Sequence, residues 1–103
     1  MKRWIAERKL LYAVKNSNKK HEMVVRISAP YIIDEGSVDF PVTPGTSACI
    51  IEIICADLHL VETIYGADSL QALQLGSNID PILKKLSKKY DLFFKDGEPY
   101  FDE

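Results

Sequence analysis

Residues 48–65 decide the fold, and they read ACIIEIICADLHLVETIY. Four isoleucines lie within residues 50–54, with only Glu52 between them. β-Branched side chains pack well against a pleated surface, so this density is typical of a strand that is buried on both faces. Apolar and polar residues then alternate to the end of the stretch, which indicates a second strand after a tight turn. We therefore predict a central strand near 48–57 and its neighbour near 59–65.

Two further strands are expected before this region. Residues 4–14 place apolar side chains on both faces of a strand in their second half, and residues 22–29 form a second alternating run. The polar residues 15–20 between them suit a turn. These strands should form a hairpin that ends at Pro30, because proline cannot donate a hydrogen bond to a ladder. Residues 38–42 also alternate, but they include a proline, so we expect a short edge strand at most.

A helix is predicted to follow these strands. Gly66 ends the last of them, and Asp68 can cap a helix whose third position is Gln71. Apolar residues recur at spacings of three and four beyond this cap. The pattern predicts a helix over 69–89 that packs one face on the sheet.

Pro81 leaves two alternatives for this helix. A proline inside a helix removes one hydrogen bond and clashes with the preceding turn. Asp80 could instead cap a second helix that has Pro81 at its first position. Because the apolar stripe stays in phase across Pro81, we favour one helix that is kinked there.

The last residues of the sequence have a pattern that is typical of a β-hairpin. The apolar residues 92–94 precede Asp96 and Gly97, a pair typical of a two-residue type I′ turn, and Pro99 restricts the last strand to a sheet edge. The whole pattern predicts an α+β fold. It consists of an antiparallel sheet of four or five strands, one kinked C-terminal helix packed on a face, and a terminal β-hairpin at 91–101.

Composition places the chain among folded proteins of one domain. It has 103 residues, of which 47% are hydrophobic and 27% charged, and these values exclude a disordered or low-complexity chain. The length accommodates one domain, 1–103. No apolar run approaches the roughly 18 residues of a membrane helix, and the first residues carry charges where a signal peptide needs an apolar core. We therefore expect a cytoplasmic protein with no membrane segment.

Charges are segregated along the chain, although the net charge is only −2. Residues 1–26 carry a net charge of +6, residues 27–83 carry −8 and contain no Lys or Arg, and residues 84–103 are balanced. Strands from the first two segments could pair, so that their charges neutralise each other across the sheet. Alternatively, the basic segment could form a face that binds an acidic partner. We favour neutralisation within the sheet.

Motifs for catalysis or metal binding are missing from the sequence. It contains no C-x-x-C, H-E-x-x-H, G-x-G-x-x-G or P-loop pattern, so we predict no catalytic residue, no cofactor and no metal, and lean away from an enzyme. His21 and His59 are expected at strand starts with no ligand role. A weaker alternative brings Cys55 and His59 together at a turn as a thiol and its base. Cys49 and Cys55 are expected to be reduced and buried.

Three blocks of sequence resemble a family of small bacterial proteins that is known only as a domain of unknown function. The blocks are Ile5-Ala6-Glu7-Arg8 at the start, Ala29-Pro30-Tyr31 in the middle, and residues 64–75, which read IYGADSLQALQL. They follow the family's order along most of the chain. The resemblance implies a fold and a bacterial source, and it carries no catalytic residue.

These patterns favour a non-enzymatic interaction or accessory module, in the manner of immunity or adaptor proteins. The alternative is a small enzyme or nucleic-acid binder with a dispersed site, although the acids of the terminal segment would repel phosphate. The candidate interface consists of Phe93, Phe94, Tyr100 and Phe101. Aromatic residues are enriched in interface cores, and a free strand edge invites pairing with a partner protein or, as a homodimer, with a second copy. In the competing interpretation, these aromatics complete the core of the monomer.

Overall fold

The two strands predicted from residues 48–65 form one hairpin of an antiparallel sheet, in which the first is central and the second lies at the edge. The computed structural model describes residues 3–34, 36 and 38–101. Strands β4 (Ser47–Cys55) and β5 (Leu58–Gly66) are joined by a two-residue turn and pair along their whole length. β4 is buried from Ser47 to Ile53, which confirms the prediction that it is covered on both faces.

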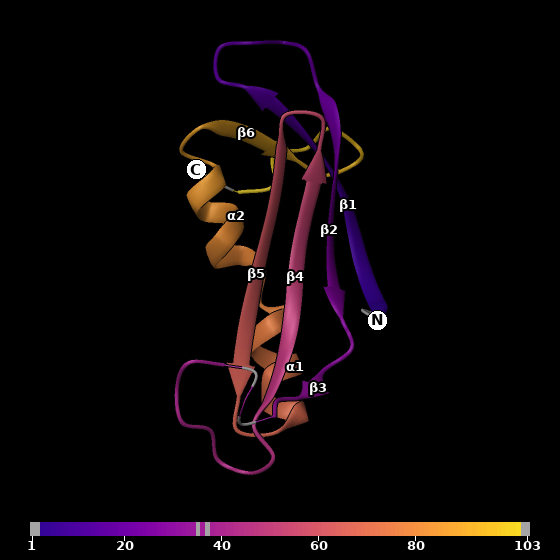
Figure 1. Ribbon diagram of the computed structural model, residues 1–103. Helices are drawn as coiled ribbons and strands as arrows, with labels where there is room; N and C mark the ends of the chain where they lie inside the picture. The colour runs from indigo at the N-terminus through magenta and orange to yellow at the C-terminus, as the bar shows by residue number, and fades with distance from the viewer. Residues whose placement is uncertain (1–2, 35, 37, 102–103) are drawn as a thin grey trace.

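The other strands extend this hairpin on the far side of β4. β1 (Trp4–Val14) pairs with β2 (His21–Ser28), and β2 pairs with β4. β3 (Tyr31–Ile32) continues the line of β2 along β4, and β6 (Tyr90–Phe93) pairs with the outer edge of β1. The order across the sheet is therefore β5, β4, β2, β1 and β6, with every pair antiparallel (Figure 1).

The prediction of an edge strand at 38–42 is wrong. Residues 38–40 form bends, and no strand is assigned to 38–42. The place beside the start of β4 is taken by β3, for which no strand was predicted. The Ile33 N–H continues this pairing by donating to the Thr46 carbonyl at 2.9 Å. The chain thus resumes sheet pairing directly after Pro30.

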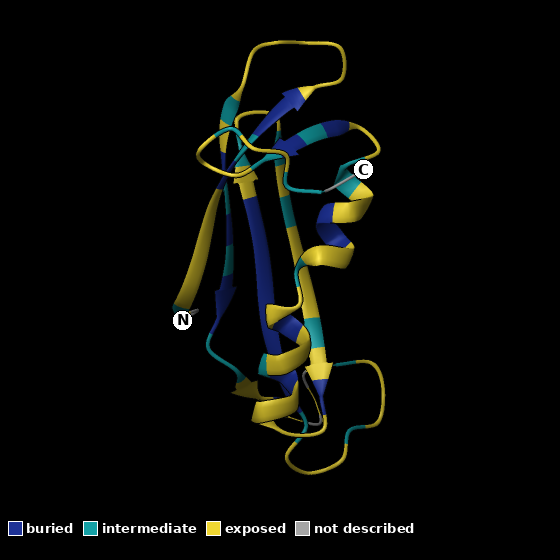
Figure 2. Cartoon of the chain, turned by 180° about the vertical axis from the view of Figure 1, so that it is seen from behind, coloured by how far each residue is buried: buried dark blue, intermediate teal, exposed yellow. Residues whose placement is uncertain are grey.

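The helical region lies on one face of the sheet and consists of α1 (Ser69–Ser77) and α2 (Asp80–Leu86). The helices lie behind β4 and β5 in Figure 1 and in front of the sheet in Figure 2. Asp68 caps α1 as predicted, because its Oδ1 accepts from the Gln71 N–H at 2.8 Å. The Gln71 side chain reaches back one residue further than in a standard capping box, to the Ala67 N–H at 2.6 Å.

At Pro81 the chain forms two helices, rather than the single kinked helix that we favoured. α1 ends at Ser77, and Pro81 lies in the first turn of α2, where a missing N–H costs no helical hydrogen bond. The apolar stripe still continues across the break, because Ile79 and Ile82 contact the same hydrophobic core. Periodicity therefore predicted which side chains pack inward, but it did not distinguish one helix from two.

The chain turns back after β6, but the returning segment does not form a strand. The Tyr100 N–H donates to the Leu92 carbonyl at 2.9 Å, and Phe93 forms a single bridge with Pro99. Gly97 has a φ of 92°, whereas Asp96 has no positive φ. A type I′ turn needs positive φ at both central residues, so the predicted type I′ turn is wrong and the chain uses a longer loop.

The core lies between the sheet and the helices. It is built from the helix-facing side chains of the strands together with α2 residues: Leu10, Tyr12, Met23, Val25, Ile27, Ile51, Ile53, Ile82, Leu83, Tyr90 and Leu92. Buried residues accordingly run along β4 and the inward sides of the helices (Figure 2). Among the described residues, no helix is long and apolar enough to span a membrane.

A substitution at Gly66 tests how closely α1 approaches the end of β5. A Cβ atom at this position would lie 2.4 Å from the Ala72 nitrogen, which is backbone and cannot rotate away. We expect Gly66→Ala to destabilise the protein by about 1–3 kcal/mol, the usual cost of overpacking. Urea unfolding measures this loss. The control is Gly36→Ala, whose Cβ would meet nothing within 4 Å, and equal stability of the two variants would contradict the close packing.

Candidate functional site

The sheet has an open face, defined here as the side chains of β1, β2, β4 and β5 that point away from the helices. Figure 1 views the molecule from this side. Strand register arranges the open face in rows across the sheet. One row is Glu7, Arg26, Glu52 and Val61, and the next is Lys9, Val24, Ile54 and His59. Residues from four strands therefore meet on one surface.

A charged network occupies the middle of the open face. The Arg26 guanidinium forms an ion pair with Glu52, and its Nε donates to Glu52 Oε1 at 2.6 Å. The other carboxylate oxygen, Oε2, lies 2.6 Å from His59 Nε2. The Trp4 ring lies against the guanidinium, with its centroid 4.2 Å from Arg26 Cζ. Both oxygens of the carboxylate thus have partners, and the guanidinium contacts both Glu52 and the Trp4 ring.

Glu52 is the buried member of this network. It is only 8% exposed, and an unpaired carboxylate at such a position would be costly. The hydrogen bond with His59 and the nearby Arg26 charge lower the pKa of Glu52 below its ordinary value of 4.5, although burial acts in the opposite direction. The side chain is therefore an ionised anchor that holds Arg26 and His59 on the surface.

Aromatic side chains gather at the β3 end of the open face. Tyr31 and Tyr65 flank the small, fully buried Ala48 on neighbouring strands. Phe40, from the loop before β4, packs edge-on against Tyr65 with ring centroids 5.2 Å apart. All three rings are exposed at their outer surfaces. This cluster of Tyr31, Phe40 and Tyr65 is called the aromatic cluster below.

A hollow lies at the opposite end of the sheet. It has a volume of about 420 Å³ and lies between β1 and β2, where Leu11 and Val24 provide apolar walls. Lys9, Glu22 and Lys95 line it as well. The open face therefore combines a hollow at one end, a paired charged network in the middle and the aromatic cluster at the other end.

The proposed pairing of Cys55 with His59 is wrong. His59 lies opposite Ile54 in the β4–β5 register, so it belongs to the open face. Cys55 is the next residue along β4 and points to the other face, where it packs against the hydrophobic core. The thiol and the imidazole are thus on opposite sides of the sheet, because side chains alternate along a strand.

The two cysteines differ in burial, and neither forms a disulfide among the described residues. Cys49 is fully buried beneath Gly76 of α1, as predicted, and burial raises the pKa of its thiol. Cys55 is only partly buried. The prediction of burial is therefore confirmed for Cys49 and wrong for Cys55. Its position at the end of β4, beyond the reach of α1, explains the difference.

The histidine His21 and the four predicted interface aromatics lie near the β6 end of the core. His21 begins β2, and its ring lies 5.4 Å from that of Tyr12. Tyr100 and Phe101 pack against the core, whereas Phe94 is exposed. Phe93 is half-buried, and Lys20 Nζ lies 4.5 Å from the centroid of its ring. The four rings are therefore divided between core and surface, and they form a mixed site rather than one continuous exposed patch.

Charge neutralisation between the basic and the acidic segment is visible where β2 pairs with β4. Arg26 lies directly opposite Glu52, so β2 from the basic segment pairs with β4 from the acidic one. Lys15, just after β1, forms an ion pair with Asp91 of β6 at 2.7 Å. Among the described residues, no group of three or more His, Cys, Asp or Glu side chains is placed to hold a metal ion.

Comparison with models of known protein families, with curated proteins and with solved structures gives no match to this chain. The resemblance to a bacterial family of unknown function therefore stays a prediction. The residues that carried it have structural positions: Ile5 to Arg8 lie in β1, Tyr31 opens β3, and the last block spans the end of β5 and most of α1.

Sequence analysis did not single out the network of Trp4, Arg26, Glu52 and His59. One signal was present, because Glu52 is the only charged residue in the apolar run from 48 to 56. A charge in such a strand needs a partner, and the register of β2 against β4 is what supplies Arg26. Before that register is known, the many lysines and arginines of the sequence are equally good candidates for the partner of Glu52.

The lowered pKa of Glu52 makes stability depend on pH in a defined direction. A carboxylate whose pKa is lower in the folded state contributes stability above its unfolded pKa, and that contribution is lost as the pH falls through the folded pKa. We expect Glu52→Gln to lower the free energy of unfolding by about 1–3 kcal/mol at pH 7. The difference from the wild type should shrink as the pH falls below 4.5. Urea unfolding across this pH range measures both effects.

Glu62→Gln is the matched control, since Glu62 is exposed on β5 and pairs opposite Ile51 rather than with a cation. This variant should follow the wild type at every pH. If Glu52→Gln were as stable as Glu62→Gln at pH 7, the carboxylate would contribute nothing to the fold.

Thiol labelling should separate the two cysteines. Under native conditions Cys55 should react with a maleimide first, whereas Cys49 should react only as fast as the protein opens, because α1 covers it and its raised pKa disfavours the thiolate. Intact mass spectrometry should therefore show a single label before the second appears. Peptide mapping that found Cys49 labelled as fast as Cys55 would contradict the packing of α1 on β4.

Proposed function

We propose that this protein is a non-enzymatic interaction or accessory module, in the manner of an immunity or adaptor protein, and that it binds a partner protein through the open face. The composition of this surface carries the proposal. Trp, Tyr and Arg are the residue types most enriched in binding hot spots, and Trp4, Arg26, Tyr31 and Tyr65 all belong to the open face or its rim.

Preorganisation supports the same conclusion. Glu52 and Trp4 hold the Arg26 side chain in one position, so little side-chain entropy remains to be lost on binding. The carboxylate also neutralises the guanidinium, so the Arg26–Glu52 pair carries no net charge. A partner that covers it therefore needs no buried counter-charge.

The chemistry of the partner follows from the rest of the surface. Val61 and Ile54 are exposed beside the network, and the aromatic cluster extends this apolar area. At the other end, the hollow between β1 and β2 can receive an apolar side chain beside the cations Lys9 and Lys95. The expected partner is a protein with an apolar, aromatic-rich surface and an acidic rim.

Two earlier expectations become part of this proposal. The exposed Phe94 stays a candidate for partner contact at the C-terminal end, where its ring packs on Tyr100, while Tyr100 and Phe101 pack against the monomer core. A second copy of the chain is a further candidate occupant, because, among the strands of the described residues, β5 pairs only with β4 and presents a free edge of nine residues. The setting we propose for these interactions is the cytoplasm of a bacterium.

Site-specific photocrosslinking tests the open face. A photoreactive amino acid at Val61 should give one discrete adduct in cells that produce the chain at its native level. Leu75 on α1 is the matched control, because Val61 is 47% and Leu75 is 48% exposed. The protein recovered in the adduct is then purified, and its binding should weaken at least about tenfold for Val61→Asp, as expected for a charge placed in an interface core, but not for Leu75→Asp.

Each outcome of this experiment has a defined meaning. An adduct of twice the chain's mass identifies a second copy as the occupant, and a heavier or lighter adduct identifies a different protein. Equal adducts from both positions, or no effect of Val61→Asp on binding, would overturn the open face as the interface.

A further inference from the structure

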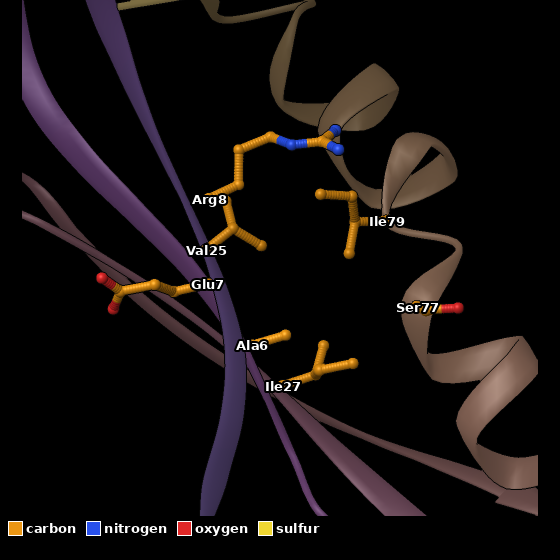
Figure 3. Close-up of a pocket in the computed structure, with 7 residues that line it drawn as sticks. All are labelled: Ala6, Glu7, Arg8, Val25, Ile27, Ser77 and Ile79. Atoms are coloured by element: carbon orange, nitrogen blue, oxygen red, sulfur yellow. The ribbon is translucent and has the colours of Figure 1, made fainter.

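A pocket lies on the helix side of the molecule, away from the open face. It has a volume of about 190 Å³ and lies between β1, β2 and the break that separates α1 from α2. Ala6, Val25 and Ile27 form its apolar floor, and Ile79 faces them from the helix break (Figure 3). The pocket exists because the helices cover β4 and β5 but leave the first half of β1 exposed.

Arg8 and Glu7 are the charged residues that line this pocket. Figure 3 shows the Arg8 side chain extending across the pocket toward Ile79, whereas the neighbouring Glu7 points the opposite way. Arg8 Nη1 donates to the Tyr100 hydroxyl at 2.7 Å, and the Tyr100 hydroxyl donates to Asp80 Oδ1 at 2.7 Å. The guanidinium is thus held in place by a neutral hydroxyl.

The remaining donors of Arg8 are available to a ligand. Within the described part of the chain, Arg8 forms no ion pair, and its one hydrogen bond leaves most of its five N–H groups open. A guanidinium presents these groups as a fork that matches the two oxygens of a carboxylate. The pocket therefore combines a cation at its rim with an apolar floor.

We propose that this pocket binds a small carboxylate with a compact hydrocarbon body. Its carboxylate pairs with Arg8, and its hydrocarbon lies on Val25, Ile27 and Ile79. The size agrees with this class, because an apolar cavity of about 150 Å³ holds a benzene ring and this pocket has about 190 Å³. A ligand of the size of benzoate fits the available space.

Asp80 sets a limit on the affinity. Its carboxylate bonds to the same hydroxyl that holds Arg8, so its negative charge lies near the site and opposes an anionic ligand. Removing that charge should strengthen binding, which provides a gain of affinity that misfolding cannot imitate.

An NMR titration with benzoate tests the site. Amide shifts in the wild type should saturate with a Kd in the millimolar range, as expected for a ligand of so few atoms, and should be confined to residues around the pocket. Arg8→Gln should weaken binding about tenfold or more, the usual effect of losing a charge-assisted hydrogen bond. Asp80→Asn should tighten it severalfold, and the neutral analogue benzamide should bind about tenfold more weakly than benzoate.

Lys19→Gln is the matched control, because it removes one positive charge from the exposed turn between β1 and β2, and Lys19 does not line the pocket. It should leave the Kd unchanged, and the spectrum of Arg8→Gln should keep the dispersion of the folded wild type. Three results would overturn the proposal: no saturable shift in the wild type, an unchanged Kd for Arg8→Gln, or shifts centred on the lysines of α2.

Discussion

The burial of β4 on both faces is the constraint on which the rest of the structure depends. A strand buried in this way must have both of its edges paired, because unpaired backbone groups are costly away from water. β5 satisfies one edge, and β2 together with β3 satisfies the other. The helices then cover one face of β4, which leaves the opposite face to be closed by its own side chains.

Glu52 shows how that second face is completed. An acidic residue in the middle of a buried strand would be unfavourable alone, but Arg26 and His59 reach it from the two neighbouring strands. The same contacts that satisfy the carboxylate also position an arginine, an imidazole and Trp4 on the surface. Stability and recognition are therefore linked at this point, since the group that stabilises the sheet also organises the proposed interface.

The break at Pro81 has an equivalent effect on the helix side. Because the proline starts a new helix, Ile79 faces β1 from a short connection and Asp80 comes within reach of Tyr100. A continuous helix would set these two consecutive residues about 100° apart around its axis. The interruption instead creates the pocket beside Arg8, at the place where the sheet extends beyond the helices.

Local patterns in the sequence were sufficient for much of the fold. The isoleucine density of residues 50–54 predicted the central strand, the Asp68 cap predicted the start of α1, and alternation predicted β1 and β2, because each of these signals depends on near neighbours in the chain. The strand at 38–42 failed, since the same alternation occurs in a loop once β3 occupies the edge of β4.

Only the tertiary structure decided which residues form the sites. Arg26 and Glu52 are 26 positions apart, and Arg8 and Tyr100 are 92 apart. No local pattern specifies such partners, because they depend on strand register and on where the helices end. A shift of one residue in the β2–β4 register would move Arg26 away from Glu52 to the other face of the sheet. The sequence by itself therefore determined most of the elements and their buried sides, whereas the register between them decided the chemistry of each surface.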